Sequence, residues 1–184
     1  PMSARRQRQM CIRDSMWSAG CSSGEEAYSL AMQVAHFLEQ RSPMTDFKLF
    51  ATDIRGDAVA SAQAATWSED RLESVPAVLR EKYLEPVGGR WRIISELRRR
   101  VIIAQHNLLT DPPFINLDLV LCRNVLIYLE RSLQEELLSR FAFTLRAGGM
   151  LWLGESEAVQ NRLFKPVAGL NLSLIHISSP RDDR

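Results

Sequence analysis

The chain has 184 residues, 46% of them hydrophobic, so it can bury one sizeable core. Its 23 basic residues nearly balance its 22 acidic residues, and the net charge of +1 excludes a global attraction to nucleic acid or anionic lipid. The three cysteines are odd in number and are not spaced as zinc ligands, which favours free thiols in a reducing cytoplasm. No apolar run approaches the ~20 residues of a membrane span, and we recognise no secretory signal peptide.

The two ends of the chain differ from its middle. Residues 1–15 begin on proline and show no sustained helical or strand period, and residues 173–184 finish in a polar tail. We interpret most of both segments as non-native or disordered additions. The folded domain is therefore expected at residues 16–172.

A glycine-containing loop precedes the first predicted helix, which covers residues 25–40. Apolar residues recur in this segment at the i, i+3, i+4, i+7 spacing of a helix with one buried face. Ser22 or Ser23 is placed to cap the helix, and Glu25 and Glu26 in its first turn suit the helix dipole.

The remaining segments alternate between short buried strands and helices. We expect strands at 48–54, 117–124 and 150–157 and helices at 57–66, 70–84 and 131–145. Gly148 and Gly149 are predicted to end the last helix. A glycine turn followed by β-branched runs predicts a small β insertion at about 88–104 that runs into the next strand of the main sheet. This order indicates an α/β fold with a mostly parallel, doubly wound sheet.

Polar residues stand where each predicted strand ends. In an open α/β sheet, ligands bind beyond the carboxyl ends of the strands. One such residue alone is explained by a cap or a turn, but five groups at the same edge of the sheet predict a binding site. These groups are Gly20–Glu25, Asp53, Asn107, Arg123–Asn124 and Glu155–Glu157.

The acidic start of the first helix decides which ligand is expected. Phosphate binds at helix N-termini because free N–H groups and the positive end of the dipole attract an anion, and Glu25 and Glu26 would repel it. The phosphate-binding GxxxxGK[ST] and GxGxxG patterns are also absent. Asp53, at the end of the second strand, is placed to hydrogen-bond ribose hydroxyls. A nucleoside with a positive charge and no phosphate fits, such as S-adenosylmethionine; the alternative is that the two glutamates serve only the dipole.

Five ordered motifs carry a resemblance to a known family. WSAGCSSGEEAYSLAM, FATDI, HNLL, LCRNVLIYL and GGMLWLGESE resemble the chemotaxis-receptor methyltransferases of CheR type, over about residues 16–167. The resemblance implies a class I methyltransferase fold and methyl transfer from S-adenosylmethionine to glutamate side chains of chemoreceptors. We accordingly expect a cytoplasmic monomer whose partner is the cytoplasmic domain of these receptors, without nucleic acid and without membrane insertion.

The resemblance also implies roles for individual residues. Tyr128 matches a tyrosine that faces the transferred methyl, with a buried aromatic as the alternative. Arg123 is a candidate for attracting the substrate carboxylate or for bracing its loop, and the β insertion matches a receptor-docking subdomain. The turn at Gly20 lets the backbone approach the nucleoside. The cofactor-contacting positions of the family are matched by Glu25, Asp53, Asn107, Leu108, Arg123 and Asn124.

Two functional hypotheses remain at this point. One is a protein-glutamate O-methyltransferase, and the other is a non-catalytic module for S-adenosylmethionine sensing or partner docking. Members of the family also carry an N-terminal helical domain and a linker that contacts the cofactor, and because neither is recognised here we expect this chain to be weak or inactive. The sequence at residues 111–124 resembles that of family members in which the methyltransferase is fused to a methylesterase. The scattered histidines predict no metal site, and Cys122 is expected to be a core thiol.

Overall fold

The computed structural model describes residues 13–41, 45–157, 163–167 and 174–177. The strands of the main sheet are β1 (Arg13–Ala19), β2 (Asp46–Asp53), β6 (Val101–Gln105), β7 (Leu117–Cys122), β8 (Leu145–Leu153), β9 (Phe164–Pro166) and β10 (Leu174–Ile177). The helices are α2 (Glu25–Arg41), α3 (Gly56–Ala64), α4 (Ala77–Tyr83), α5 (Ser95–Arg98) and α6 (Arg131–Thr144), with single 3-10 turns η1 (Glu69–Leu72) and η2 (Leu126–Tyr128). Within these residues no helix is long and apolar enough to cross a bilayer.

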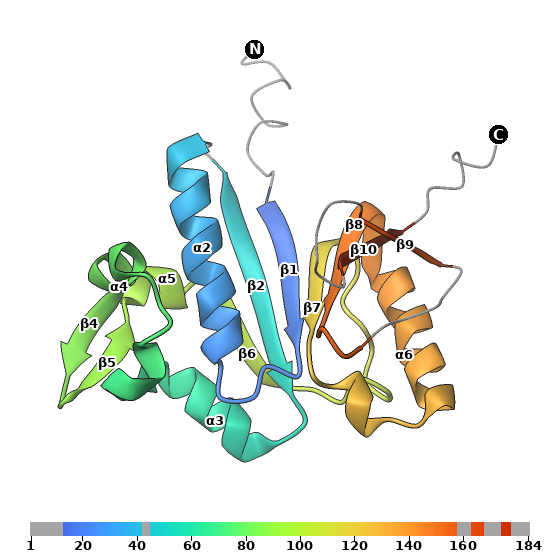
Figure 1. The fold of residues 1–184 in the computed structure, drawn as a ribbon, viewed down its shortest axis with the longest axis horizontal. Coiled ribbons are helices and arrows are strands. Elements are labelled where there is room, and N and C mark those ends of the chain that lie inside the picture. Colours follow the sequence, from blue (N-terminus) through green and yellow to red (C-terminus); the bar gives the residue numbers. More distant parts are fainter. Residues whose placement is uncertain (1–12, 42–44, 158–162, 168–173, 178–184) are drawn as a thin grey trace, which may run out of the picture.

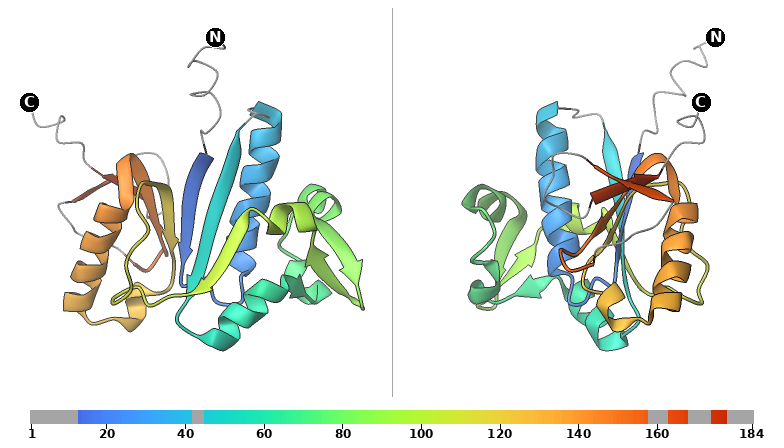
Figure 2. Two further views of the ribbon diagram at one scale, coloured as in Figure 1. Left: turned by 180° about the vertical axis from the view of Figure 1, so that it is seen from behind. Right: turned by 45° about the vertical axis from the view of Figure 1, so that its right-hand side comes forward.

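A seven-stranded sheet in the order β6-β2-β1-β7-β8-β10-β9 forms the centre of the molecule (Figure 1). The strands β6, β2, β1, β7 and β8 run parallel, and β10 is antiparallel to β8 and β9. Helices α2 and α6 lie on opposite faces of this sheet (Figure 2). The prediction of an α/β fold with a mostly parallel, doubly wound sheet is confirmed.

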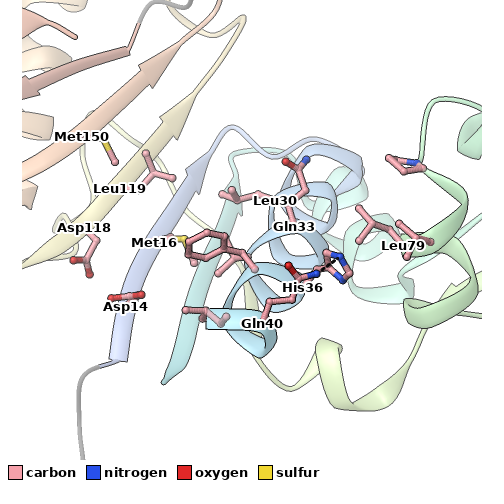
Figure 3. Close-up of a pocket in the computed structure, with 15 residues that line it drawn as sticks. Asp14, Met16, Leu30, Gln33, His36, Gln40, Leu79, Asp118, Leu119 and Met150 are labelled. Atoms are coloured by element: carbon pink, nitrogen blue, oxygen red, sulfur yellow. Dashed lines mark hydrogen bonds between the residues drawn. The ribbon is translucent and has the colours of Figure 1, made fainter. Parts of the chain in front are cut away.

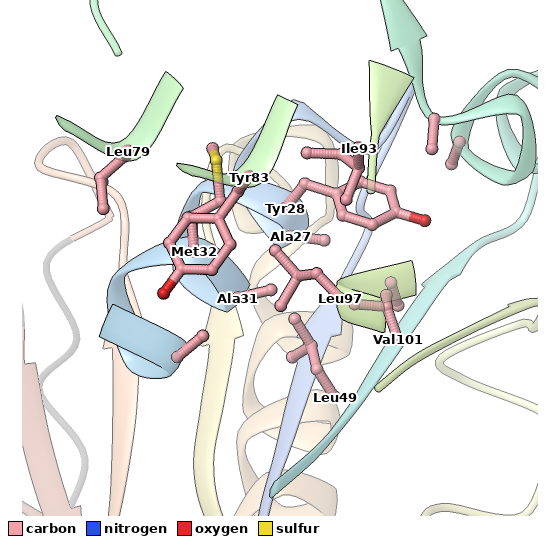
Figure 4. Close-up of a cluster of buried hydrophobic side chains, with 14 of the residues drawn as sticks. Ala27, Tyr28, Ala31, Met32, Leu49, Leu79, Tyr83, Ile93, Leu97 and Val101 are labelled. Atoms are coloured by element: carbon pink, nitrogen blue, oxygen red, sulfur yellow. The ribbon is translucent and has the colours of Figure 1, made fainter. Parts of the chain in front are cut away.

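Alternating side chains of the central strand β1 enter two separate cores. Met16 packs with α2 on one face, in the cluster that includes Leu49 and Leu97 (Figure 4). Trp17 packs with α6 on the other face, where its ring meets Phe141 edge-on at a centroid distance of 5.7 Å. This alternation follows from the two-residue period of a strand, whose successive side chains point to opposite faces of the sheet.

The glycine pair at 148–149 does not end α6 as predicted. The helix ends at Thr144, and β8 begins at once and contains both glycines. The register between β7 and β8 shifts between Leu117 and Leu119, and a Cβ at Gly149 would lie 3.0 Å from the Leu117 carbonyl oxygen. The pair therefore forms an irregularity in the strand, where glycine allows the neighbouring backbone to approach closely.

The small β region is larger than predicted and begins earlier. It is a three-stranded sheet in the order β3-β5-β4, formed by β3 (Thr66–Trp67), β4 (Leu84–Val87) and β5 (Arg90–Ile93). The predicted helix at 70–84 divides into η1 and α4, with Pro76 immediately before α4. β5 lies within the predicted insertion, whereas β3 and β4, of two and four residues, were not predicted because strands this short show no clear period.

The strands of the main sheet begin before and continue after the expected domain limits in the sequence. β1 begins at Arg13, and β10 pairs with β8 inside the segment interpreted as a polar tail. Pairing with a neighbouring strand, and not local composition, places these residues in the sheet.

Two phenylalanines on α6 provide a test of how this helix packs against the main sheet. Phe141 is fully buried, whereas 72% of Phe143 is exposed. We expect Phe141→Ala to lower the free energy of unfolding by about 3–5 kcal/mol because it removes a ring from a closed core. Phe143→Ala, the matched control, should change it by less than about 0.5 kcal/mol. Urea denaturation followed by circular dichroism measures both, and equal losses would contradict the burial described.

Candidate functional site

A cavity of about 720 Å³ lies beyond the carboxyl ends of β1, β2, β6 and β7. Its volume is within the range of roughly 300–1,000 Å³ that is typical of small-molecule sites. The structure brings eight of the residues predicted for the site to the lining of this cavity: Gly20, Glu25, Asp53, Asn107, Leu108, Arg123, Asn124 and Tyr128. The fifth predicted group, Glu155–Glu157, does not line it. Parallel strands explain the convergence, since their carboxyl ends meet at one edge of the sheet.

The loop after β1 is held tightly against its neighbours. The backbone N–H groups of Gly20 and Cys21 both donate to the Thr52 carbonyl oxygen at 2.8 Å. Gly20 has a φ of 75°, and a Cβ at this position would lie 2.5 Å from Cγ2 of Val125. Only glycine fits here, because a side chain would both strain the backbone and collide with the loop after β7.

Asp53 is a fixed acceptor at the end of β2. One carboxylate oxygen accepts the Ser22 N–H at 2.9 Å and the other accepts the Arg55 N–H at 3.0 Å. The side chain is 12% exposed, and its nearest cation is the Arg55 guanidinium, at 4.0 Å. Each oxygen keeps a further lone pair, so the carboxylate can still accept hydrogen bonds from two ligand hydroxyls.

The loop after β6 contributes one polar and one apolar wall. The Asn107 side-chain oxygen accepts the Leu109 N–H at 3.0 Å, and the Asn107 N–H donates to Asp111 at 2.8 Å. The side-chain amide N–H₂ of Asn107 takes no part in this turn and is its remaining donor group. Leu108 supplies apolar surface beside it.

Glu157 organises the loop after β7, a role that the sequence did not reveal. Its carboxylate is 4% exposed and accepts the backbone N–H groups of Asn124, Leu126 and Gly154 at 2.9, 2.7 and 2.8 Å. Asn124 has a φ of 57°, a left-handed conformation that these bonds hold in place. The motif GESE placed a carboxylate at this strand end, but only the structure shows that it points inward to the backbone.

Tyr128 ends this loop as an exposed residue. It lies on η2 and lines the cavity, with 82% of its surface accessible. The alternative of a buried aromatic is therefore wrong. The phenol stands at the mouth of the site, where it can reach a second molecule.

The two glutamates at the start of α2 have different partners. Glu25 accepts a hydrogen bond from the Ser23 hydroxyl at 2.5 Å and lies 3.6 Å from the Arg71 guanidinium. Glu26 forms an ion pair with Arg123 at 2.7 Å, so it does more than serve the helix dipole. Burial raises the pKa of Glu26, and the neighbouring Arg123 opposes that rise.

The predicted serine cap of α2 is not present. The Ser23 hydroxyl donates to a carboxylate, and the residue before the helix is Gly24, whose carbonyl oxygen accepts the Tyr28 N–H at 2.9 Å. Gly24 has a φ of 91°, and a Cβ there would lie 3.0 Å from the Ala62 Cβ. Close packing against α3 thus selects glycine at this position.

The described cysteines are core thiols. Cys122 is fully buried, and burial raises the pKa of its thiol well above the ordinary value. Burial and the nearby Asp53 raise the pKa of Cys21 to about 12. Both thiols therefore stay protonated near neutral pH, which excludes thiolate chemistry at these positions.

A second cavity of about 700 Å³ lies between α2 and the face of the sheet (Figure 3). Its walls are mainly apolar side chains such as Leu30, Leu79, Leu119 and Met150. It contains none of the residues predicted for the site, and it lies along the strands instead of at their carboxyl ends.

The family model for the CheR methyltransferase, SAM-binding domain, matches residues 2–170. The chain belongs to this family. S-adenosylmethionine is the family's cofactor, and three observations fit it: a backbone cradle that excludes side chains at Gly20, free acceptor capacity at Asp53, and acidic side chains where a phosphate would need N–H donors.

Related proteins share the same stretch of sequence. The chain is 36% identical to chemotaxis protein methyltransferase 2 of Pseudomonas aeruginosa, covering 84% of this chain and 56% of that protein. It is 33% identical to the chemotaxis protein methyltransferase of Borreliella burgdorferi, covering 79% and 52%. An uncharacterized 104.1 kDa protein of Rhodobacter capsulatus is 41% identical over 144 residues, which are 78% of this chain and 15% of that protein. The chain thus spans about half the length of the two methyltransferases.

The solved structures to which the chain is similar are distant in sequence. A SAM-dependent methyltransferase from Methanosarcina mazei matches with a TM-score of 0.47 and 14% identity, covering 83% of this chain and 57% of that one. Phosphoethanolamine N-methyltransferase 2 of Haemonchus contortus, in complex with S-adenosylmethionine, matches with a TM-score of 0.46 and 16% identity, covering 80% and 26%.

The contribution of the Glu157 carboxylate to stability can be tested by comparison with Glu155, a neighbour on the same turn. We expect Glu157→Gln to lower the free energy of unfolding by about 1–3 kcal/mol, since an amide cannot accept all three N–H bonds without turning a donor toward one of them. Glu155→Gln, at an exposed position, is the matched control. Thermal unfolding of both variants decides the matter, and an unchanged midpoint for Glu157→Gln would refute the role assigned to it.

Proposed function

We propose that this chain is the cofactor-binding and catalytic domain of a cytoplasmic protein-glutamate O-methyltransferase that methylates chemoreceptors. The observation that carries the proposal is the cavity that gathers eight of the predicted site residues at the strand ends of a chain of this family. The names of the relatives, which are chemotaxis protein methyltransferases, support the choice of substrate.

The proposed cofactor contacts follow from the groups available in the cavity. Asp53 accepts from ribose hydroxyls, and the Gly20 backbone lies against the nucleoside. Leu108 provides apolar surface and Asn107 the amide donors, while Asn124 lies on the opposite loop. Glu25 faces the positive groups of the cofactor in this proposal. When bound, S-adenosylmethionine supplies an electrophilic methyl group on a sulfonium.

The chain's own residues then act mainly by positioning. A glutamate side chain in water has a pKa of about 4.3, so the substrate is ionised at neutral pH and needs no general base. Tyr128, exposed at the mouth of the cavity, is proposed to orient the incoming carboxylate through its hydroxyl. Arg123 already pairs with Glu26, which favours a bracing role over capture of the substrate. Correct alignment of two reactants is a large source of acceleration.

The Rhodobacter relative supports a second proposal about the parent protein. A sequence 41% identical to this chain occupies 15% of that much longer protein. We infer that this domain also functions within a multidomain signalling protein, as in the versions fused to a methylesterase. The non-catalytic sensing module remains the alternative to catalysis in such a setting.

Cofactor binding is tested at Asp53. Isothermal titration of this chain with S-adenosylmethionine should show Asp53→Ala binding at least about 10-fold more weakly, because the loss removes a charge-assisted acceptor for hydroxyls. Asp57→Ala is the matched control, since its side chain is 79% exposed and does not line the cavity. Thermal unfolding verifies that both variants fold. Equal affinities for the two variants would refute the assignment of Asp53.

Methyl transfer is tested with a longer protein that contains this domain, and the substrate is the cytoplasmic fragment of a chemoreceptor. We expect base-labile methyl incorporation, and a Tyr128→Phe variant with a kcat lowered roughly 10-fold to 100-fold because misalignment of the reactants costs rate. Its affinity for S-adenosylmethionine should stay within about threefold of the original, since binding does not depend on that hydroxyl. Cofactor binding without any methyl transfer would overturn the enzymatic function and favour the sensing module.

A further inference from the structure

The short turn η2 carries Tyr128, and the backbone of this turn decides where the phenol can reach. Because 82% of the surface of Tyr128 is accessible, packing of its ring contributes little to its position. The turn is a 3-10 helix of only three residues, a form whose own hydrogen bonds have poorer geometry than those of an α-helix. The groups that hold η2 from outside therefore control the position of the phenol.

Gln134, near the start of α6, binds the backbone on both sides of Tyr128. Its side-chain nitrogen lies 2.9 Å from the carbonyl oxygen of Leu126 and 3.0 Å from that of Leu129. A primary amide has two N–H groups, and here each is directed to one of these carbonyls. The residue before Tyr128 in this pair opens the turn, and the residue after it directly follows the turn. One side chain thus closes η2 around the phenol-bearing residue.

Leu126 is the best-anchored residue of the turn. Its N–H donates to Glu157 at 2.7 Å, its carbonyl oxygen accepts from Gln134, and its side chain is 3% exposed in the core beside α6. Glu157 therefore fixes the entry to η2, on the side before Tyr128. Gln134 also bonds beyond Tyr128, at Leu129, so it fixes the exit from the turn as well.

Gln134 itself does not line the cofactor cavity. The groups proposed to contact the cofactor at Asp53 and Asn107 lie on other loops, after β2 and β6. A change at Gln134 therefore acts on the turn at the mouth of the cavity and leaves these contacts in place.

We propose that Gln134 is a positioning residue that holds Tyr128 in the orientation needed for methyl transfer. This inference rests on the proposed function, because Gln134 acts through the role assigned there to the Tyr128 hydroxyl. Without the two N–H donors, the carbonyls of Leu126 and Leu129 lose the partner that they share, and the turn gains freedom to move. A displaced phenol aligns the incoming carboxylate less often, which lowers the rate of transfer and not the affinity for the cofactor.

A purely structural role for Gln134 makes a different prediction. If the amide only stabilised α6, its loss would reduce activity to the same extent whether or not Tyr128 carried its hydroxyl. If Gln134 acts through that hydroxyl, its loss matters only while the hydroxyl is present. A double-mutant cycle with Tyr128→Phe separates the two roles.

The test measures methyl transfer to the cytoplasmic fragment of a chemoreceptor, by a longer protein that contains this domain, at saturating S-adenosylmethionine. Gln134→Met removes both donors at nearly unchanged side-chain length, and we expect it to lower kcat about 10-fold. Its affinity for S-adenosylmethionine, from isothermal titration, should stay within about threefold of the original. Glu136→Met is the matched control at an exposed position of α6, and it should change kcat by less than about twofold.

The comparison that decides the matter is made in the Tyr128→Phe background. There, Gln134→Met should lower kcat by less than a further factor of about two, because the hydroxyl through which it acts is already gone. A 10-fold loss in both backgrounds would overturn the inference and leave the proposed function intact. Absence of methyl transfer by the original protein would instead count against the proposed function.

A second variant separates loss of the donors from loss of the fold. Gln134→Lys keeps N–H donors at this position and should retain a kcat within about threefold of the original. A loss as large as that of Gln134→Met would contradict the role of the donors. Thermal unfolding verifies that each variant compared is folded at the temperature of the assay.

Discussion

The parallel pairing of β1 with β2 on one side and with β7 on the other is the constraint on which the site depends. Because all three strands run in the same direction, the loops that follow them leave the sheet at a common edge. The approach is close enough that a Cβ at Gly20 would collide with Val125 of the β7 loop. The cavity is consequently a product of strand direction, and its walls come from segments that are far apart in the chain.

Carboxylates hold these loops in place by accepting backbone N–H groups. Asp53 accepts two, Glu157 accepts three, and Asp111 accepts the Asn107 N–H. Backbone donors in irregular segments need partners when they are buried, and here side chains supply them. The loops are thus shaped without help from a ligand, and a preformed site loses less conformational entropy when a ligand binds. In a phosphate site the same donors would remain free for the anion.

The glycines at position 20 and at positions 148–149 show which structural features a local sequence pattern can predict. Gly20 was expected to let the backbone approach a ligand, and its positive φ and its contact with the β7 loop agree with a position that only glycine can occupy. The pair at 148–149 has the same local appearance, yet it lies within β8 and forms an irregularity in the ladder with β7. The two cases differ in their neighbours from other parts of the chain, which a local pattern does not contain.

The sequence by itself determined the α/β class, the long helix that begins beside the cavity, the edge of the sheet where the cavity lies and eight of the residues that line it. These features depend on the periodicity of apolar residues and on the direction of the strands, both of which follow from the order of residues in the sequence. The tertiary structure alone decided that Glu26 pairs with Arg123, that Glu157 turns inward to three backbone donors, and that Tyr128 is exposed. It also decided the strands β3 and β4 of the small sheet and the strand β10. Each of these depends on the distance between side chains or strands that are remote in the chain, and that distance is fixed only when the elements pack.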